Sequence, residues 1–342
     1  MTAPPPATDP CPSDLMAAAV AATVPALPLV RLLGTTLAAV PPIEKPDGSP
    51  VTAADYAVQA VVVSRLRALL PHGRVPLLGE EHADALVASR RPDAERLVVD
   101  AVRSVLGWRS RAEAIRAIEG DEPRAGEPHW TLDPIDGTKG FVAGEQCSVC
   151  LAMVSGADVA VAVLGCPRMA GAGDAGLHPG GPGVIYAAAS GAGAYEVSAD
   201  GGARSRIALP AWSGGAVRWA RSMNRSASPA PSRLEPLLEA VGPLREVRMD
   251  SQCKYALVAR GDADLAVRLP RGAGHRESAW DHASGVLLVS EAGGAVSDAR
   301  GARLDFSHGA SLSANSGVLC AARGLDRAVA PIVAGLAEGS SR

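Results

Sequence analysis

Seven residues in the first half of the chain read Leu132-Asp133-Pro134-Ile135-Asp136-Gly137-Thr138. We expect a strand over residues 129–132 that ends at Asp133 and leads into this segment. Pro134 fixes one backbone dihedral angle and Gly137 permits a tight path, so the two aspartates can converge on one point. Converging carboxylates repel each other unless a cation lies between them, and Mg²⁺ prefers oxygen ligands. The segment is therefore either a plain turn or a metal site to which the carbonyl of Ile135 adds a ligand.

Two further acidic positions lie at the ends of expected elements. Glu80 follows Gly79 after a short strand expected over residues 75–78, so a carboxylate is presented at a strand end. Asp281 comes directly before an apolar helix expected over residues 282–292, where an aspartate is first of all an N-cap. A helix N-terminus is also well placed beside a bound phosphate. The acidic cluster predicted in this way consists of Glu80, Asp133, Asp136 and Asp281.

Asp55 is a candidate catalytic carboxylate. It lies in the first turn of a helix expected over residues 54–70, with Thr52 as its cap, and an aspartate there also favours the helix dipole. In the functional interpretation Asp55 helps to activate an attacking water, with Thr138 as its hydrogen-bond partner. The amides of Gly137 and Thr138 point where an anion could bind. Phosphoryl transfer needs mainly positioning and charge neutralisation, so this set suffices without a serine or cysteine nucleophile.

Lysine is rare in this chain, which makes each lysine informative. Among 33 lysine and arginine residues, the lysines are Lys45, Lys139 and Lys254. The compact ammonium of lysine cannot be copied by the planar guanidinium of arginine. Lys254 follows Ser251 by three residues in a helix expected over residues 251–260, so both lie on one face and could reach a phosphate. Arg268, near the end of a strand expected over residues 265–269, is either a second anion ligand or a surface charge.

Composition excludes several classes of protein. With 342 residues, 47% of them hydrophobic, the chain can build a sizeable core, and a net charge of −3 argues against a general nucleic-acid binder. The six cysteines lack the dense spacing of a disulfide framework, and Cys147 and Cys150 would face opposite ways on a strand. We expect no apolar run long and uninterrupted enough to span a membrane. We expect a monomer that binds a small-molecule substrate.

The first residues of the chain, 1–12, are rich in proline and predicted to be disordered. No arginine precedes Arg31, so this segment makes a poor organelle-targeting peptide as it stands. We expect a soluble intracellular protein of the cytoplasm, or of an organelle such as the chloroplast if a transit peptide was removed.

Strands and helices are mixed along the chain, which predicts a layered α/β or α+β fold. We expect an α+β metal-site subdomain at residues 13–167, a Gly-rich loop at 168–183 and an α/β substrate-side subdomain at 184–338. We expect one strand pair at residues 147–155 with 159–164 and another at 184–189 with 193–197. We expect further helices at residues 15–40, 84–89, 93–118, 231–240 and 326–337. The first of these helices is expected to break at Pro25 and Pro28.

The acidic segments resemble those of the inositol monophosphatase-like, lithium-sensitive phosphatase superfamily. The resemblance covers roughly residues 43–317 and rests on Gly79-Glu80-Glu81, Asp133-Pro134-Ile135-Asp136-Gly137-Thr138 and Trp280-Asp281-His282-Ala283-Ser284-Gly285. Within the superfamily the chain is similar to the 3′(2′),5′-bisphosphate nucleotidase (PAP phosphatase) branch. This narrower similarity is carried by Lys139-Gly140-Phe141, Gly144-Glu145-Gln146, Asp250-Ser251-Gln252 and Arg268-Leu269-Pro270.

The resemblance implies an alternating α/β/α/β/α sandwich and a phosphatase that uses two or three Mg²⁺ ions. By resemblance, the metal ligands would be Glu80, Asp133, the Ile135 carbonyl, Asp136 and Asp281, and the catalytic residues would be Asp55 and Thr138. The substrate would be bound by Gly137, Thr138, Ser251, Lys254, Arg268 and Asp281. The implied reaction removes the 3′-phosphate of 3′-phosphoadenosine 5′-phosphate (PAP) and gives AMP and phosphate, with the sulfated nucleotide PAPS as a further substrate.

Some positions differ from the pattern of the nucleotidase branch, so other functions remain alternatives. Met223-Asn224-Arg225 stands where the family usually has a histidine that contacts the nucleotide, and Ala143 stands where a basic residue is common. An inositol polyphosphate or monophosphate phosphatase is therefore an alternative. A second alternative is a sensor that binds metal and nucleotide without turning the nucleotide over.

Overall fold

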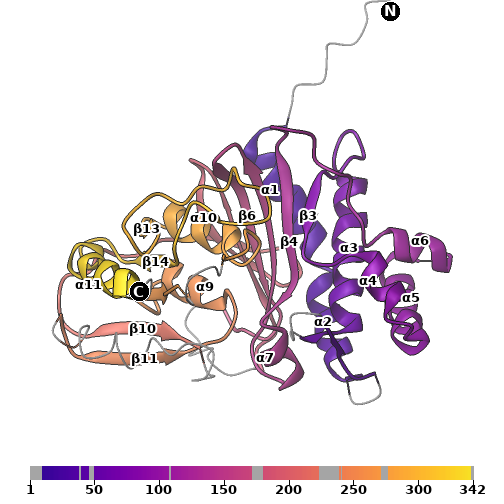
Figure 1. Cartoon of the computed structure of the whole chain (residues 1–342), viewed down its shortest axis with the longest axis horizontal. Coiled ribbons are helices and arrows are strands. Elements are labelled where there is room, and N and C mark those ends of the chain that lie inside the picture. The colour runs from indigo at the N-terminus through magenta and orange to yellow at the C-terminus, as the bar shows by residue number, and fades with distance from the viewer. Residues whose placement is uncertain are drawn as a thin grey trace, which may run out of the picture.

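A computed structural model gives the fold of the chain. It describes residues 10–37, 40–45, 50–107, 109–171, 180–222, 239, 241–270 and 276–339. Two large sheets alternate with helices, so that the layers run α/β/α/β/α (Figure 1). The layered α/β fold predicted from the sequence is confirmed.

The first sheet has seven strands, which lie in sequence order and pair antiparallel, except for the parallel pair of β3 and β4. Its strands are β3 (Leu77–Gly79), β4 (His129–Asp136), β5 (Ser148–Ser155), β6 (Asp158–Cys166), β7 (Val184–Ala189), β8 (Gly193–Ser198) and β9 (Arg204–Ile207). Both strand pairs predicted from the sequence are present, as β5 with β6 and β7 with β8.

Helices cover the outer face of this sheet. Three of them, α1 (Pro12–Thr23), α2 (Ala26–Gly34) and α3 (Ala53–Leu69), pack against its strands. Farther out, α4 (Ala83–Ala88), α5 (Pro92–Leu106) and α6 (Arg111–Arg116) pack against α3 and one another. A small hairpin of β1 (Ile43–Glu44) and β2 (Pro50–Val51) precedes α3. The prediction of one helix over residues 93–118 is wrong. Gly107, at a φ of +77°, ends α5 in a conformation that glycine adopts readily, and Ser110 caps a new helix.

Alternation along the strands explains why both faces of the first sheet are buried. Val149 and Leu151 of β5 join the core under α1, α2 and α3, whereas Cys150 and Ala152 join the core that faces α9 (Cys253–Ala259) and α10 (Ala283–Glu291). Successive side chains of a strand point to opposite faces, so one strand supplies two cores.

The second sheet forms the fourth layer and lies on the other side of α9 and α10. Its strands, in spatial order, are β11 (Leu244–Arg248), β10 (Val217–Arg221), β12 (Leu265–Arg268), β14 (Val318–Ala321) and β13 (Ala295–Ser297). Its outer face packs against α11 (Leu325–Gly339), which buries Leu325, Val329 and Val333 (Figure 1). The final helix predicted over residues 326–337 is confirmed.

One segment, Pro12–Gly34, is long and apolar enough to cross a membrane by length and composition, which corrects the expectation that no apolar run reaches that size. The segment is two helices here, because the chain turns at Val24 and Pro25. Pro28 does not break α2, since it lies in the first turn, where no intrahelical donor is lost. Both helices pack against α3, and Leu27 and Val30 are fully buried.

The first sheet continues beyond the Gly-rich segment, because β7, β8 and β9 extend it as far as Ile207. The change to the second sheet falls between Ile207 and Val217. The proposed division into 13–167, 168–183 and 184–338 stays a prediction. The helix predicted at residues 231–240 lies almost entirely outside the described residues. So do half of the Gly-rich segment, residues 172–179, and all of Met223 to Arg225.

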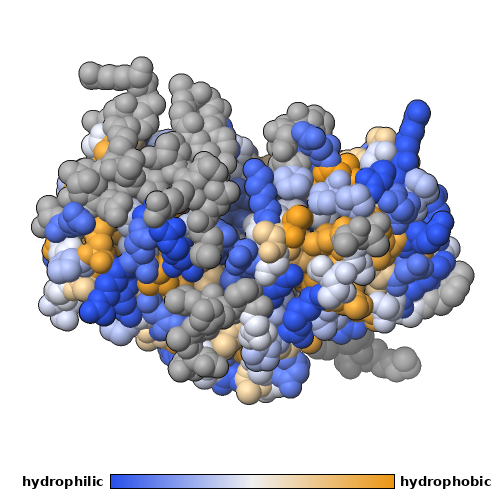
Figure 2. All heavy atoms as spheres, turned by 90° about the horizontal axis from the view of Figure 1, so that it is seen from below, coloured by the Kyte–Doolittle hydropathy of each residue, from blue (hydrophilic) through white to orange (hydrophobic). Residues whose placement is uncertain are grey.

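Figure 2 shows the molecule from below, with hydrophobic atoms gathered among hydrophilic ones on the side where the N-terminal helices lie in Figure 1. Over the part of the chain that the structure describes, the large apolar side chains that are exposed are Leu32, Leu69, Val87 and Val142. Single exposed apolar side chains are ordinary features of protein surfaces, so they indicate no particular partner.

Candidate active site

The end of β4 carries the first two carboxylates of the site. β4 pairs regularly with β5 up to Asp133 and Cys150, and the next pair is Asp136 with Ser148, so the register advances three residues in β4 against two in β5. Such a bulge redirects side chains and accommodates a proline within a strand. The sequence predicts that the strand ends at Asp133, whereas the bulge carries it on to Asp136. The Ile135 N–H donates to Oδ1 of Asp133 at 3.0 Å and fixes this carboxylate.

Gly137 turns the chain from β4 into the short helix α7 (Thr138–Val142). Its φ is +85°, in the left-handed region that favours glycine. A Cβ at this position would lie 3.0 Å from Cβ of Ser251. The turn therefore packs directly against the segment before α9, and a larger residue at position 137 would separate the two.

Three carboxylates from two distant segments converge beside this turn. Asp133 and Asp136 belong to β4, and Asp281 lies in the turn before α10. One oxygen of each lies within 4.8 Å of the others. Carboxylates at this spacing repel each other, and a divalent cation with oxygen ligands relieves the repulsion. Three of the four residues of the predicted acidic cluster thus lie close enough together to hold a metal ion, and their oxygen donors suit a hard cation.

Burial and mutual repulsion shift the acidity of the three carboxylates. Burial, followed by the charges of Glu80 and Asp136, raises the pKa of Asp133 well above its ordinary value. Burial and the charge of Asp136 raise the pKa of Asp281 to about 8. Burial also raises the pKa of Asp136, although the charge of Lys254 opposes it. A cation competes for these oxygens more successfully as the pH rises, because fewer protons then occupy them.

Glu80 lies beside the three carboxylates and is paired with a lysine. The Glu80 N–H donates to the Leu132 carbonyl at 3.0 Å, which places it next to β4. Lys45 Nζ donates to Oε1 of Glu80 at 2.9 Å and to Oε1 of Glu81 at 2.7 Å. Glu81 is buried, and burial followed by the charge of Asp55 raises its pKa to about 8.

Sequence reasoning missed Lys45 and Glu81 as neighbours of the site. The rarity of lysine and the position next to Glu80 were the signals available for them. Neither signal shows that the fold brings Lys45 to the end of β3. Lys45 precedes Glu80 by 35 residues. Such a contact depends on the fold and not on local pattern.

Asp55 is a buried carboxylate that faces Thr138, as the sequence predicts. The Thr52 N–H and Oγ1 both donate to Oδ2 of Asp55 at 2.7 Å, which closes a capping box at the start of α3. Oγ1 of Thr138 lies 3.5 Å from the other oxygen, Oδ1, and 3.0 Å from the Ile135 carbonyl. A hydroxyl has one proton, so Thr138 donates to one of these acceptors at a time. Burial raises the pKa of Asp55 to about 7, although the Thr52 hydrogen bond opposes it.

Ser251 and Lys254 do meet, but not on one helical face as predicted. α9 begins only at Cys253, and Ser251 precedes it with a φ of +61°, which is uncommon for a residue with a side chain. Lys254 Nζ donates back to the Ser251 carbonyl at 2.8 Å. Burial lowers the pKa of Lys254, and the charge of Asp136 opposes that shift. The lysine therefore lies half-buried, close to the acidic cluster.

Gln252 is a residue of the site that sequence reasoning did not single out. Its N–H donates to Oδ2 of Asp136, and its side-chain Nε2 donates to the Trp280 carbonyl at 2.7 Å. Its Oε1 accepts from Oγ of Ser284 at 2.8 Å and from the Gly285 N–H at 3.1 Å. One buried amide thus links the start of α9, the start of α10 and Asp136.

We expect Gln252→Ala to lower the free energy of unfolding by about 2–4 kcal/mol, because it leaves buried polar groups of the Trp280 to Gly285 segment unpaired. Turnover at the candidate active site should fall as well, since Asp281 lies in that segment. Asn315→Ala is a matched control, because Asn315 also bridges two backbone groups, at Arg303 and Asp305, outside the site. Thermal and urea unfolding measure both variants. Equal activity losses in the two variants would contradict a role of Gln252 in the site.

Asp281 is placed near the other acids, but it does not cap α10 as predicted. The N-cap residue is His282, and Asp281 belongs to the preceding turn, where its N–H donates to the Ser278 carbonyl at 3.3 Å. Its carboxylate is therefore turned to the cluster and not to the helix. Gly285 brings α10 close to α9, because a Cβ there would lie 2.0 Å from the Tyr255 ring.

Arg268 ends β12, and its guanidinium is bound by an acid that sequence reasoning did not name. Its Nε lies 3.2 Å from Oε1 of Glu277, and its Nη2 lies 3.1 Å from Oε2. Burial opposes ionisation of Glu277, but the hydrogen bond with His282 and the charge of Arg268 lower its pKa to about 2. The charge of Arg268 acts on Asp136, on Asp281 and on Lys254, so the guanidinium lies at the same site.

Solved structures share this architecture. The IMPase of Thermotoga maritima superposes with a TM-score of 0.61 at 20% identity, over 92% of this chain and 96% of that one. The extragenic suppressor protein SuhB of Bartonella henselae gives a TM-score of 0.60 at 17% identity, over 90% and 93%. At such identities the likeness shows the fold, and it confirms the predicted sandwich type.

The sequence model of the inositol monophosphatase family matches residues 34–335, most of the chain. The chain belongs to this family. The superfamily resemblance inferred from the acidic segments is thereby confirmed, and the protein is a hydrolase of the inositol monophosphatase family. Membership also agrees with the metal dependence expected from the acidic cluster.

Curated relatives of this inositol monophosphatase family protein are bisphosphate nucleotidases. The 3′(2′),5′-bisphosphate nucleotidase of Emericella nidulans is 35% identical over 310 residues, 83% of this chain and 87% of that protein. The enzyme of the same name from Schizosaccharomyces pombe is 34% identical, over 83% of each chain. The 3′,5′-bisphosphate nucleotidase 2 of Arabidopsis thaliana is also 34% identical, over 81% of this chain and 83% of that protein. The similarity to the nucleotidase branch is confirmed.

Proposed function

We propose that the protein is a Mg²⁺-dependent phosphomonoesterase that removes the 3′-phosphate of PAP and gives AMP and phosphate. The observation that carries this proposal is the convergence of Asp133, Asp136 and Asp281 within 4.8 Å, beside the buried Asp55 and Thr138. The nucleotidase relatives at 34–35% identity support the choice of substrate. PAPS is a further substrate under this proposal.

The residues of the site fit a hard divalent cation. Glu80, Asp133, Asp136 and Asp281 would hold Mg²⁺ through carboxylate oxygens, together with the carbonyl of Ile135. The raised pKa values of Asp133 and Asp281 support this assignment, because burial and the negative charge of neighbouring carboxylates disfavour the ionised form of both, although Arg268 opposes the shift at Asp281. The chemistry that bound Mg²⁺ supplies is neutralisation of phosphate charge and a lowered pKa of the attacking water.

Asp55 and Thr138 would orient that water. Oδ2 of Asp55 is engaged by Thr52, so Oδ1, which faces Thr138, is the oxygen left to accept a proton. A pKa near 7 suits a group that takes up a proton at neutral pH. Thr138 fixes the direction of Oδ1 and would hold the water through its hydroxyl oxygen.

Basic and amide groups would bind the nucleotide on the other side of the site. The amides of Gly137 and Thr138 would hold the scissile phosphate, and Asp281 would contact the substrate beside it. Ser251, Lys254 and Arg268 would bind the remainder of the nucleotide. Lys254 and Arg268 contribute positive charge next to the acids, which supports an anionic substrate there.

A substrate panel at fixed Mg²⁺ tests the proposal. Phosphate release is compared for PAP, PAPS, inositol 1,4-bisphosphate and inositol 1-phosphate, and PAP should give the highest kcat/KM. Preference for an inositol phosphate would replace the nucleotidase by an inositol phosphatase of the same family. PAP binding in calorimetry without any phosphate release would favour a sensor without turnover.

We also propose that the protein works in a reducing compartment inside the cell. All six cysteines are free, and five of them are buried. Cys147 and Cys150 join opposite cores, as predicted, so their spacing supports no redox pair. Free buried thiols are typical of proteins from reducing compartments.

We expect the metal-free protein to lose stability as the pH rises from about 5 to about 8. The pKa values of Asp55, Glu81 and Asp281 are about 7, 8 and 8 in the folded protein, against about 4 for such groups in an unfolded chain. The folded state binds more protons than the unfolded state between these limits, so stability is greatest at the acid end and decreases through this window. Thermal unfolding after EDTA treatment measures the trend.

The same argument predicts that Mg²⁺ stabilises more as the pH rises. The gain in Tm on adding Mg²⁺ should increase from about pH 5 to about pH 8, because the ion replaces protons that the carboxylates have lost. A gain that is constant or that shrinks over this range would contradict the placement of the ion among these carboxylates.

A further inference from the structure

A chain of hydrogen bonds leads from the core to Arg268. Oη of Tyr255 lies 2.7 Å from Nδ1 of His282, and Nε2 of His282 lies 3.3 Å from Oε2 of Glu277. Glu277 then pairs with Arg268 through both of its carboxylate oxygens. Tyr255, His282 and Glu277 are buried, whereas Arg268 is about one-third exposed, at 32%. Arg268, the last residue of this chain of contacts, is therefore the one of the four whose side chain a ligand can reach.

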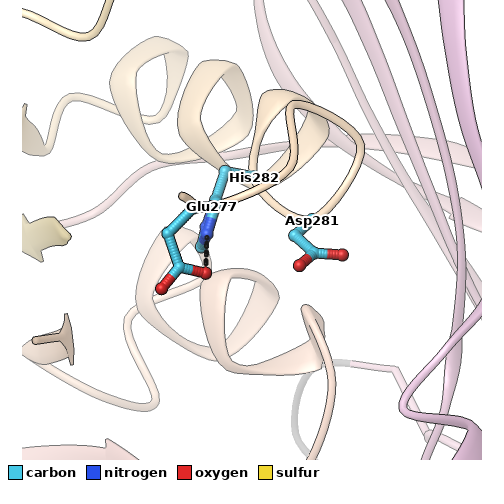
Figure 3. Close-up of side chains that lie close together, drawn as sticks. All are labelled: Glu277, Asp281 and His282. Atoms are coloured by element: carbon cyan, nitrogen blue, oxygen red, sulfur yellow. Dashed lines mark hydrogen bonds and ion pairs between the residues drawn. The ribbon is translucent and has the colours of Figure 1, made fainter. Parts of the chain in front are cut away.

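Neighbouring residues send their side chains to different parts of the site. Figure 3 shows His282 bonded to Glu277, while the carboxylate of Asp281 lies to one side of that pair. Ligand atoms of Glu277, Asp281 and His282 lie within 4.8 Å of one another. Both ring nitrogens of His282 already have partners, in Tyr255 and Glu277, so these three residues carry no second metal site.

The donors and acceptors of this chain can be assigned. An ionised carboxylate only accepts, so Nε2 of His282 must carry the proton that it donates to Glu277. Nδ1 of the neutral ring is then an acceptor, and Tyr255 donates its hydroxyl proton to it. Each bond fixes the direction of the next, as in chains where a carboxylate orients a histidine.

We propose that Tyr255, His282 and Glu277 are positioning residues that hold the guanidinium of Arg268 in the direction needed to bind the non-reacting, anionic part of the substrate. This inference rests on the proposed function for the nature of that substrate. A bidentate carboxylate restricts a guanidinium to one plane, and the donors on its far side then present a fixed geometry to an anion. The chain of contacts acts on binding and not on the bond that breaks, because none of its members touches Asp55 or Thr138 in the structure.

Tyr255→Phe is the variant that tests this proposal. It removes one hydroxyl and keeps the ring against Gly285. The KM of the substrate should rise about threefold to tenfold, as expected for loss of one hydrogen bond, while kcat changes little. Tyr186→Phe is the matched control, since Tyr186 is another buried tyrosine whose hydroxyl has a partner, Arg260 Nη1 at 2.8 Å, outside the site. The control should lower Tm without changing KM.

A double-mutant cycle with Arg268→Ala decides whether the effect passes through the arginine. In the Arg268→Ala background, Tyr255→Phe should raise KM no further, because there is no guanidinium left to orient. An equal rise of KM in both backgrounds would overturn the proposal. So would a Tyr255→Phe variant that resembles Tyr186→Phe, with a lower Tm and an unchanged KM.

The same experiment separates this inference from the proposed function. Wild-type protein is first assayed on PAP and on inositol 1-phosphate, and the cycle is run on the ester that it hydrolyses faster. Turnover of inositol 1-phosphate alone would overturn the nucleotidase proposal and still test the coupling. If neither ester is turned over, the nucleotidase proposal fails and the cycle is run on PAP affinity measured by calorimetry. Binding of neither ester would overturn both, because a positioning role presupposes a binding site for a phosphate ester.

Discussion

Asp133→Asn should abolish phosphate release and at the same time raise the Tm of the metal-free protein. Asp133 is 2% exposed and lies within 4.8 Å of two other carboxylates. The asparagine keeps Oδ1 as an acceptor for the Ile135 N–H but carries no charge, so repulsion in the empty site decreases. Under the proposed function Asp133 is a metal ligand, and its loss would weaken the charge stabilisation that bound Mg²⁺ supplies. We therefore expect kcat to fall by at least about 10³-fold.

A fall in kcat together with a rise in the Tm of the metal-free protein distinguishes this effect from simple destabilisation of the fold, which would lower both. Asp264→Asn is the matched control, because Asp264 is also buried and its Oδ2 accepts from Nε of Arg218 at 3.0 Å, away from the acidic cluster. That control should lower the Tm and leave the response to Mg²⁺ intact. Asp133→Asn should raise the Tm in EDTA and show little further gain on adding Mg²⁺. A lower Tm in EDTA together with a normal Mg²⁺ response would contradict our account of Asp133.

Asp55→Asn is expected to lower kcat by about 10²- to 10⁴-fold, the usual contribution of a positioned general base. The asparagine side chain can still accept from Thr52, so the start of α3 should remain folded. Asp55 is not among the three converging carboxylates, so the stabilisation by Mg²⁺ should largely persist. This combination, slow turnover with retained metal binding, differs from the result expected for Asp133→Asn.

Glu113→Gln provides the matched control for Asp55→Asn. Glu113 occupies the same N3 position of a capping box, with Ser110 at the start of α6, but it is exposed and outside the site. Steady-state kinetics and Mg²⁺-dependent unfolding are measured for both variants. A kcat for Asp55→Asn within a few-fold of the control value would show that Asp55 serves only as a helix cap.

Local sequence patterns predict the elements that carry the acids, because each pattern depends on neighbouring residues. Thr52 and Asp55 form the cap expected from their spacing, and Glu80 follows a strand as expected. The Asp133 to Gly137 segment also places two carboxylates together, although the bulge that does so is visible only in the register with β5. Periodicity alone could not show that bulge.

Contacts between distant segments explain what the sequence did not predict. Gln252 and Asp136 are 116 residues apart, and Lys45 reaches Glu80 only because the chain returns to the end of β3. The sequence predicts that Ser251 lies in the same helix as Lys254 and on one face with it. Ser251 instead has a left-handed backbone conformation, and α9 begins only at Cys253. The sequence predicts that Asp281 caps a helix, because the residue stands directly before one. In the structure His282 is the N-cap, and Asp281 lies with Asp133 and Asp136.

Phosphate release from PAP by the purified wild-type protein, with excess Mg²⁺ and after removal of metal with EDTA, is the most direct test of the central claim. We predict one phosphate and one AMP per PAP consumed when Mg²⁺ is present, and release at the background rate after EDTA. Release that is undiminished by EDTA, or intact PAP with Mg²⁺ under conditions where inositol 1-phosphate is hydrolysed, would contradict a Mg²⁺-dependent bisphosphate nucleotidase.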